Sequence, residues 1–306
     1  MASSPSDADR AASGADRRPS ESDRQVWTLL VSCPDQRGIV AALAQVLYGH
    51  GANILHADQH TDPLAGIFFQ RIRFDTTELR TDATSLKAAI AEVADRLQMR
   101  WRLSEPSRPK RVAIFVSRTD HCLYDLLLRH RAGELDCELS MIVSNHESLA
   151  PVAAQFDVPY HVFPITKETK RAQEEKEIAL LDGADIDLVV MARYMQILSS
   201  DFVEHFIHRV INIHHSFLPA FSGGKPYHQA HERGVKLIGA TAHYATKDLD
   251  EGPIIEQDVI RASHQDTIAE LVRKGRDVER NVLSRAVRWH LDDRVLVYGN
   301  KTVVFQ

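Results

Sequence analysis

Residues 209–259 contain polar side chains whose types and spacing suit the activation of a carbonyl group. Asn212 and His214 alternate with Ile211 and Ile213. Because successive side chains of a strand point to opposite faces, this pattern predicts that Asn212 and His214 project together. An amide donates a fixed hydrogen bond, and an imidazole can donate or carry a proton. Together they would stabilise a carbonyl oxygen as it becomes an oxyanion.

An N-x-H triplet alone could equally be a pair of satisfied polar groups at a strand end. The rest of the segment makes the pattern specific. It reads FLP, a flexible loop SGGK at 222–225, a helix PYHQAHERG, then GATAHY and LDEGPII. These motifs resemble the superfamily of hydrolases and transferases that use formyltetrahydrofolate. Members of that superfamily carry an Asn, a His two residues later, and an Asp in a D-x-G-x-I-I segment.

The resemblance implies a role for each matching residue. Asn212 and His214 would polarise the formyl carbonyl, Asp250 would handle the proton of the attacking group, and His243 would steady the site. Efficient base catalysis would favour a raised pKa of Asp250 in a closed site.

An upstream segment, MARYMQILS at 191–199, resembles the folate-binding loop of the same superfamily. Apolar side chains with backbone polar groups at their edge suit a flat pterin. The residues expected to form this slot are Met195, Gln196, Ile197, Leu198 and Val203. Without the other motifs, the same stretch would be interpreted as the buried start of a helix.

The elements around these motifs predict an open α/β domain over residues 109–306. Short apolar strands such as RVAIFVS, ELSMIVS and IDLVVMAR alternate with helical segments. This succession indicates a mostly parallel, Rossmann-like sheet with crossover helices. Active sites of such sheets lie at the carboxyl ends of the strands, where the candidate residues fall.

Residues 25–108 predict a smaller domain with a βαββαβ succession. Its order of elements and its D-x-x-G-I-V entry resemble the ACT domain, a ferredoxin-like regulatory module. The resemblance implies an amino-acid effector bound by Asp35, Arg37, Gly38, Ile39 and Asn53. On the residues alone, Asp35 could merely cap the helix while Gly38 allows close packing. The domain could also build a homo-oligomer, which we expect, through sheet or helix pairing.

The composition of the rest of the chain limits where the protein is expected to be located and which partners it is expected to bind. Residues 1–24 lack an apolar period and predict a disordered tail, and SEPSRPKR at 104–111 predicts a linker with the boundary near Arg108. A net charge of −5 argues against nucleic-acid and membrane partners. Three cysteines without C-x-x-C spacing, and no apolar run of about 18 residues, favour a cytoplasmic protein.

Bound cofactors are not expected. The segment is rich in histidines, namely His215, His228, His231 and His243. HQAHE does not match the zinc motif H-E-x-x-H, so we expect no metal. The chain also lacks G-x-G-x-x-G, so a nicotinamide cofactor is unsupported. A small-molecule folate substrate is the expected partner.

The acceptor of the formyl group separates members of the superfamily. The stretch VSRTDHCL after the first strand of the larger domain contains no glycine, which disfavours a phosphate cradle and a phosphorylated acceptor. The chain continues only to DRVLVYGNKTVVFQ, so we expect no nucleic-acid-binding barrel after the catalytic domain. Water then remains as the acceptor.

An ACT-like domain before such a catalytic domain is similar to the formyltetrahydrofolate deformylase family. This similarity implies hydrolysis of 10-formyltetrahydrofolate to formate and tetrahydrofolate, balancing one-carbon supply for purine synthesis. The alternatives are a formyltransferase with an unidentified, non-phosphorylated acceptor and a non-catalytic folate sensor. The sensor would require a broken triad, whereas Asn212, His214 and Asp250 are all present.

Overall fold

The computed structural model describes residues 25–105, 108–219 and 226–306. The tail predicted at 1–24 and the loop predicted at 222–225 lie outside the described residues. Contacts divide the chain into two compact units, one of residues up to 57 with 72–106, the other of 58–71 with 107–306. Among the helices of the described segments, none combines the length and the apolar character needed to cross a membrane.

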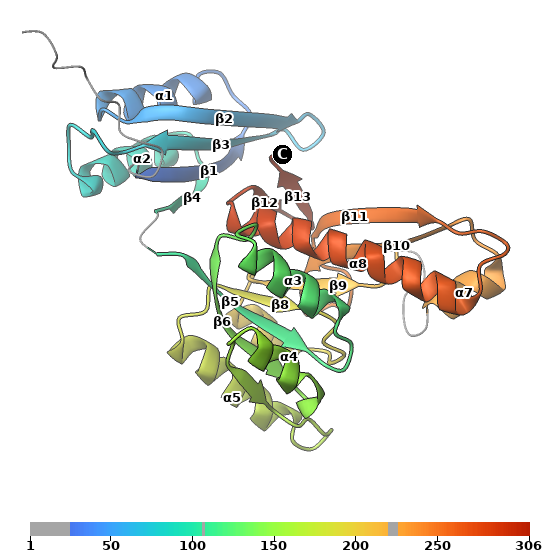
Figure 1. Ribbon diagram of the computed structural model, residues 1–306. Helices are drawn as coiled ribbons and strands as arrows, with labels where there is room; N and C mark the ends of the chain where they lie inside the picture. The colour runs from blue at the N-terminus through green and yellow to red at the C-terminus, as the bar shows by residue number, and fades with distance from the viewer. Residues whose placement is uncertain (1–24, 106–107, 220–225) are drawn as a thin grey trace, which may run out of the picture. The chain divides into compact units, whose positions relative to one another are not determined.

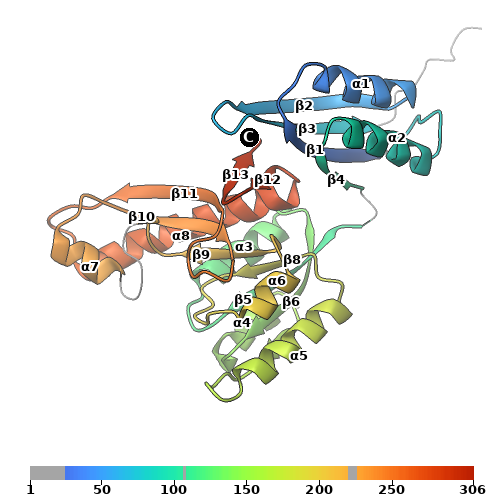
Figure 2. The same cartoon turned by 180° about the vertical axis from the view of Figure 1, so that it is seen from behind.

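The N-terminal part has the expected βαββαβ order. Its elements are β1 (Val26–Pro34), α1 (Ile39–Gly49), β2 (Asn53–Asp62), β3 (Ile67–Asp75), α2 (Ala83–Arg96) and β4 (Arg100–Ser104). They form a four-stranded sheet in the order β2-β3-β1-β4, with both helices on one face (Figures 1 and 2). Leu43 and Leu47 on α1, and Leu86 and Ile90 on α2, are buried at a spacing that gives each helix one apolar face. The predicted ferredoxin-like ACT fold is confirmed.

The C-terminal part forms the expected α/β domain around one large sheet. Its elements, apart from a short 3-10 turn at Glu147–Leu149, are β5 (Lys110–Val116), α3 (His121–Arg131), β6 (Cys137–Ser144), α4 (Ala150–Gln155), β7 (Tyr160–Val162), α5 (Lys170–Gly183), β8 (Leu188–Met191), α6 (Ser200–His205), β9 (Val210–His214), α7 (Pro226–Arg233), β10 (Leu237–Tyr244), β11 (Ile254–Arg261), α8 (Ile268–Leu291), β12 (Val295–Tyr298) and β13 (Lys301–Val304). The seven-stranded order is β11-β10-β9-β8-β5-β6-β7. Strands β5 to β9 pair in parallel and β10 and β11 in antiparallel fashion, which confirms the mostly parallel sheet.

The sheet is buried on both faces because its central strands are apolar throughout. In β5, Ile114 and Val116 belong to one hydrophobic cluster, whereas Ala113 and Phe115 belong to another. The alternation of side chains along a strand therefore supplies two cores from one short sequence. The long helix α8 packs along β9, β10 and β11 and helps to cover the first cluster (Figure 1).

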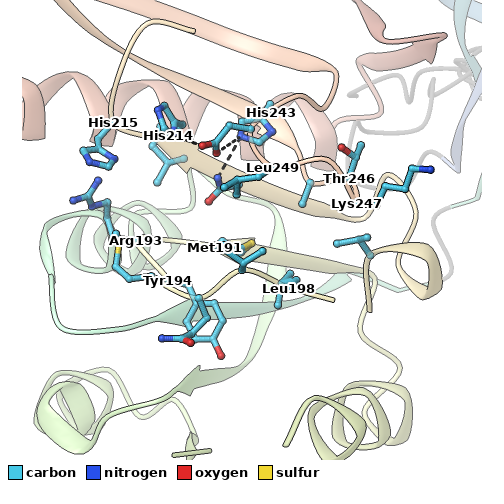
Figure 3. Close-up of a pocket in the computed structure, with 18 residues that line it drawn as sticks. Met191, Arg193, Tyr194, Leu198, His214, His215, His243, Thr246, Lys247 and Leu249 are labelled. Atoms are coloured by element: carbon cyan, nitrogen blue, oxygen red, sulfur yellow. Dashed lines mark hydrogen bonds and ion pairs between the residues drawn. The ribbon is translucent and has the colours of Figure 1, made fainter. Parts of the chain in front are cut away.

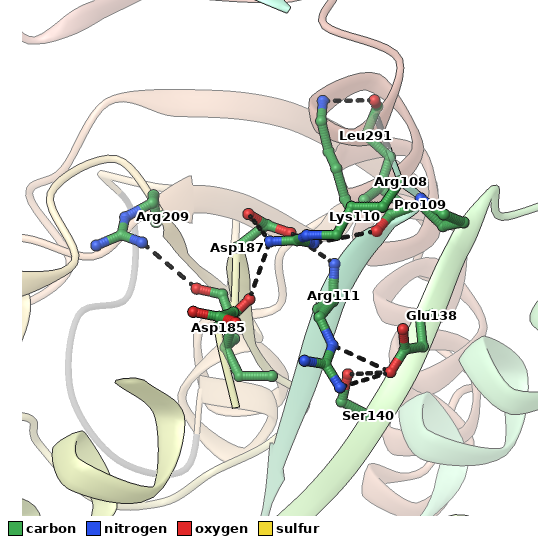
Figure 4. A network of polar contacts seen from close by, with 11 residues as sticks. Arg108, Pro109, Lys110, Arg111, Glu138, Ser140, Asp185, Asp187, Arg209 and Leu291 are labelled. Carbon is green, nitrogen blue, oxygen red and sulfur yellow. Dashed lines mark hydrogen bonds and ion pairs between the residues drawn. The ribbon is translucent and has the colours of Figure 1, made fainter. Parts of the chain in front are cut away.

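Paired charges join the strands at their amino ends (Figure 4). The Arg108 guanidinium lies 2.6 Å from a carboxylate oxygen of Asp187, and that carboxylate also accepts a hydrogen bond of 2.7 Å from the backbone N–H of Arg111. The Arg111 side chain reaches Glu138 at 2.9 Å. Strands β5, β6 and β8 are thus tied together at the end where each begins.

Candidate active site

The pairing of β9 with β10 sets the first side chains of the site. Asn212 on β9 lies directly opposite His243 on β10, and His214 lies opposite Thr241. Opposite residues in an antiparallel pair share one face of the sheet, so the register brings Asn212 and His243 into contact. Asn212, His214 and His243 line one cavity of about 340 Å³ together with Asp250 (Figure 3).

Asp250 reaches this cavity from the loop between β10 and β11. Its backbone is left-handed, with φ at 58°, a conformation that costs energy for a residue with a side chain. Two residues later, a Cβ on Gly252 would stand 1.8 Å from the carbonyl oxygen of Tyr244. Only glycine lets the loop lie this close to the end of β10, so Gly252 is required to bring Asp250 back over the sheet.

The hairpin of β12 and β13, which the GN turn at 299–300 predicts, clamps the same loop. The Asn300 side-chain amide donates a hydrogen bond of 2.8 Å to the carbonyl of Glu251. The Thr302 hydroxyl donates one of 2.6 Å to the carbonyl of Ile254. The segment that carries Asp250 is therefore held from two sides.

The Asp250 carboxylate is paired with both histidines of the cavity. Its oxygens lie 3.1 Å from Nδ1 of His214 and 3.7 Å from Nε2 of His243. Burial alone would raise the pKa of Asp250, but the hydrogen bond with His214 and the proximity of His243 hold that pKa well below its ordinary value. The expectation of a raised pKa was wrong, because it did not include two imidazole partners. Asp250 is a carboxylate at neutral pH.

The hydrogen bonds of His243 fix the orientation of Asn212. His243 Nδ1 lies 3.0 Å from the carbonyl oxygen of Tyr244, and a carbonyl can only accept, so Nδ1 carries a proton. In the neutral ring, Nε2 then accepts from the Asn212 side-chain N–H at 3.2 Å. The second N–H of the Asn212 amide is left to donate to a ligand in the cavity.

His214 offers the complementary group. Its Nδ1 faces the Asp250 carboxylate, which accepts a proton-bearing nitrogen. Its Nε2 is buried and has no hydrogen-bond partner in the described structure. A buried unpaired nitrogen costs free energy unless a ligand pairs with it. The site thus presents a free N–H of Asn212 and the unpaired Nε2 of His214 beside a carboxylate. His214 Nε2 donates a hydrogen bond when both nitrogens of the ring carry a proton.

The predicted folate residues all line the same cavity: Met195, Gln196, Ile197, Leu198 and Val203. Met195 and Ile197 are about 60% exposed, whereas Leu198 and Val203 are buried. The stretch from 192 to 199 is irregular and α6 begins only at Ser200, so the alternative of a buried helix start was wrong for this stretch. An open loop with exposed apolar side chains over a buried floor is suited to a flat aromatic ligand.

Sequence reasoning missed the residue that anchors this loop. The Ser117 hydroxyl, at the end of β5, accepts a hydrogen bond of 2.9 Å from the backbone N–H of Met195. It donates one of 2.8 Å to the Asn145 side chain. Ser117 lies just after a buried strand in a mostly parallel sheet, a position that could have marked it as facing the site.

A buried acid beneath the loop was also missed. Glu177 on α5 has no exposed surface and accepts a hydrogen bond of 3.4 Å from the Tyr194 hydroxyl. Burial, and then the nearby Glu174, raise the pKa of Glu177 to about 7. The second carboxylate oxygen of Glu177 has no hydrogen-bond partner among the described residues.

One group in the described segments has the residue types of a metal site. Ligand atoms of His121, Cys122 and Glu279 lie within 4.8 Å of one another. The Glu279 carboxylate is already occupied, by His121 Nε2 at 2.8 Å, the Tyr227 hydroxyl at 2.6 Å and the Arg193 guanidinium at 3.5 Å. Burial keeps the pKa of the Cys122 thiol well above its usual value. An ion-paired carboxylate beside a neutral thiol is a polar cluster rather than a vacant ligand set.

Four of the effector candidates lie around the start of α1, whereas Asn53 is the first residue of β2. Gly38 is the N-cap, with φ at 91°, and no side chain caps this helix, so Asp35 does not have the capping role considered from the sequence. Asp35, Arg37 and Asn53 are exposed, whereas Ile39 is buried. Ile39 could therefore contact a ligand through its backbone but not through its side chain.

Known proteins resemble the chain over both parts. A family model described as "Formyl transferase" matches residues 110–287, and one described as "ACT domain" matches 27–93. The fold and site thus define a formyl transferase-type domain joined to an ACT domain.

Individual relatives identify the family more specifically. The chain is 57% identical over 278 residues to a formyltetrahydrofolate deformylase of Synechocystis sp., covering 91% of this chain and 98% of that protein. It is 52% identical to the formyltetrahydrofolate deformylase of Bacillus subtilis, covering 90% and 93%. The crystal structure of a formyltetrahydrofolate deformylase from Pseudomonas syringae superposes with a TM-score of 0.89 at 47% identity, covering 92% and 95%. The chain belongs to the formyltetrahydrofolate deformylase family.

Proposed function

We propose that this chain hydrolyses 10-formyltetrahydrofolate to formate and tetrahydrofolate, with Asn212, His214 and Asp250 as catalytic residues. The observation that carries the proposal is the placement of a free Asn212 N–H and the unpaired His214 Nε2 beside the ionised Asp250 carboxylate in one cavity. The named relatives are deformylases rather than transferases, so a transferase is not favoured.

The substrate would place its pterin in the slot formed by residues 195–198 and Val203. The formyl oxygen would then accept hydrogen bonds from the Asn212 amide and, with both ring nitrogens protonated, from Nε2 of His214. These donors are held by His243 and Asp250 before substrate arrives, at 3.2 Å and 3.1 Å. Preorganised donors stabilise the developing oxyanion without the cost of reorientation during the reaction.

Water would attack the formyl carbon while Asp250 accepts its proton. A carboxylate that is ionised at neutral pH is available for this step, and substrate that excludes water would strengthen its basicity. Collapse of the tetrahedral intermediate breaks the bond between the formyl carbon and nitrogen, and the nitrogen takes a proton as it leaves. This route uses side chains of the chain alone and involves no bound cofactor or metal.

The test is an assay of purified protein with 10-formyltetrahydrofolate and no acceptor amine. We expect formate and tetrahydrofolate in equal amounts, and loss of both products in Asp250→Asn. Tight folate binding without formate release, in protein shown by calorimetry to be folded, would contradict the proposal.

We also propose that residues 25–108 form a regulatory domain and 109–306 the catalytic domain. The exposed side chains of Asp35 and Arg37 near the start of α1 support an amino-acid ligand there, and Asn53, exposed at the start of β2, is a further candidate. Self-association through β2, an edge strand of the ACT sheet, would make the protein a homo-oligomer. Titration calorimetry with single amino acids and light scattering would test these two proposals.

A cytoplasmic location is proposed from cysteine chemistry. Cys33, Cys122 and Cys137 are all free thiols, as is typical of a reducing compartment. A role in balancing one-carbon pools for purine synthesis follows from the products. Fractionation of cells followed by immunoblotting would check the location.

A further inference from the structure

The reaction pocket has a wall that the chemistry described above does not use. In Figure 3, Arg193 and His215 face each other at one end of the pocket, whereas Thr246 and Lys247 lie at the other. Arg193 and His215 both line the cavity that contains Asp250. The rings of His214 and His215 have centroids 5.3 Å apart, so this wall adjoins the reacting groups.

The carboxylate of Glu279 holds the wall from behind. It is 1% exposed and lies 3.5 Å from the Arg193 guanidinium. Burial would raise the pKa of Glu279, but the hydrogen bond with His121 and the charge of Arg193 hold that pKa below its ordinary value. Arg193 itself has a left-handed backbone with φ at 65°, a costly conformation that the ion pair helps to retain.

Tyr227 connects the same carboxylate to His215. Its hydroxyl donates a hydrogen bond of 2.6 Å to Glu279, and its ring centroid lies 6.1 Å from that of His215. Helix α8 makes room for it: a Cβ on Gly275, one turn before Glu279, would stand 2.0 Å from the Tyr227 hydroxyl. Gly275 and Glu279 therefore form one seat for Tyr227 on α8.

His215 separates two cavities. It lines the reaction pocket, and it also lines a second cavity of about 320 Å³ behind it. The described residues of this second cavity are mostly apolar, among them Phe217, Ala230, Ile238 and Val259. Beyond His215 there is thus space for a small apolar molecule, adjacent to the position of the formyl group.

We propose that Glu279 is a positioning residue which, through Arg193 and Tyr227, keeps His215 in place as a partition, so that water but no larger nucleophile can reach the formyl carbon. The inference rests on the proposed hydrolysis and assigns its acceptor specificity. The partition would act by exclusion: a nucleophile larger than water requires the volume that lies behind His215.

An amine in the joined cavities would react by a balanced exchange. Its nitrogen would bond to the formyl carbon as the bond from that carbon to the folate nitrogen breaks. The proton lost by the amine would pass to Asp250 and then to the departing nitrogen. The products are an N-formylamine and tetrahydrofolate, with no oxidant or further reactant.

Benzylamine, a small apolar primary amine, is the probe. Wild-type protein, His215→Ala and Glu279→Gln are each incubated with 10-formyltetrahydrofolate and benzylamine, and formate and N-formylbenzylamine are quantified by chromatography. We expect formate alone from wild type. The ratio of N-formylbenzylamine to formate should rise by at least about tenfold in His215→Ala, and less in Glu279→Gln, because removal of a steric block of a few atoms changes discrimination on that scale.

Val259→Ala is the matched control, because it enlarges the second cavity without touching the partition. Its product ratio should equal that of wild type. If Val259→Ala shifted the product ratio as far as His215→Ala does, the partition would be overturned. The volume of the second cavity would then explain the specificity. Glu279→Gln keeps the shape of the side chain and decides the question if His215→Ala fails to fold.

The outcomes separate the two proposals. Formate release by wild type with an unchanged product ratio in folded His215→Ala and Glu279→Gln would overturn the partition only. Absence of formate from wild type would overturn the hydrolysis itself. A structural role of Glu279 alone would lower the turnover of both products together and leave their ratio unchanged.

Discussion

The two ends of the large sheet are built on opposite principles. At the amino ends, Arg108, Asp187, Arg111 and Glu138 satisfy one another at the surface (Figure 4). At the carboxyl ends, His214 and His243 are buried, and His214 Nε2 lacks a partner within the described residues (Figure 3). One end is arranged for pairing within the chain and the other for pairing with a ligand.

The difference shows how stability and function are divided within one sheet. Exposed ion pairs each contribute little to stability, and that contribution does not depend on whether a ligand is bound. A buried polar atom without a partner costs stability, which the remainder of the fold must offset. Substitutions at the two ends should therefore change different observables.

The largest expected effect is from Asp250→Asn, at the functional end. Loss of the proton acceptor should lower the rate of formate release by about 10³-fold, the scale of general-base catalysis. Folate binding, measured by fluorescence quenching, should change little. If Asp250→Asn kept most of the activity, the carboxyl ends of the sheet could no longer be assigned to function and the amino ends to stability.

Asn212→Ala should have the second-largest effect. It removes a donor to the oxyanion and should lower kcat by about 10²-fold to 10³-fold with a smaller change in KM. Steady-state kinetics with 10-formyltetrahydrofolate measures this. An increase in KM at constant kcat would instead mean that Asn212 binds substrate and transition state equally.

Glu177→Gln should raise stability at the functional end. The folded pKa of Glu177, about 7, exceeds its ordinary 4.5, so the folded protein holds an extra proton between these pH values and loses stability as the pH rises through this range. The Gln variant lacks this loss and should be more stable by up to about 3 kcal/mol at pH 8, with no gain near pH 4. Denaturant unfolding at both pH values measures the difference.

Glu175→Gln, on the exposed face of the same helix, is the control for that comparison. It should leave the stability unchanged at both pH values. An equal gain in the two variants would assign the effect to overall charge rather than to the burial of Glu177.

The smallest effect is expected from Arg108→Ala, at the amino ends. The pair with Asp187 is part exposed and screened by solvent, so its loss should lower stability only slightly and leave kcat unchanged. Thermal unfolding and the formate assay check both. Arg171→Ala removes a still more exposed pair and should have no measurable effect.

The sequence predicted what depends on local pattern. The βαββαβ and parallel α/β successions follow from the period of apolar residues, and the common face of Asn212 and His214 follows from strand geometry. The catalytic roles of these residues and the domain boundary stay predictions.

Long-range pairing could not be predicted. The register that sets His243 opposite Asn212 depends on how β9 and β10 align, and the pKa of Asp250 depends on that alignment. Glu279 left one usable signal: it falls on the buried stripe of α8 with Leu271, Val278 and Val282, where an acid requires a partner. The identity of its partners still required the tertiary structure.

The hairpin of β12 and β13 has a consequence for the timing of maturation. During synthesis the chain emerges from its amino end, and domains fold as they emerge. The hairpin follows α8 in sequence, so Asn300 and Thr302 leave the ribosome after all the segments that they clamp. The loop carrying Asp250 is therefore fastened last, and a nascent chain would hold folded strands before it could deformylate anything.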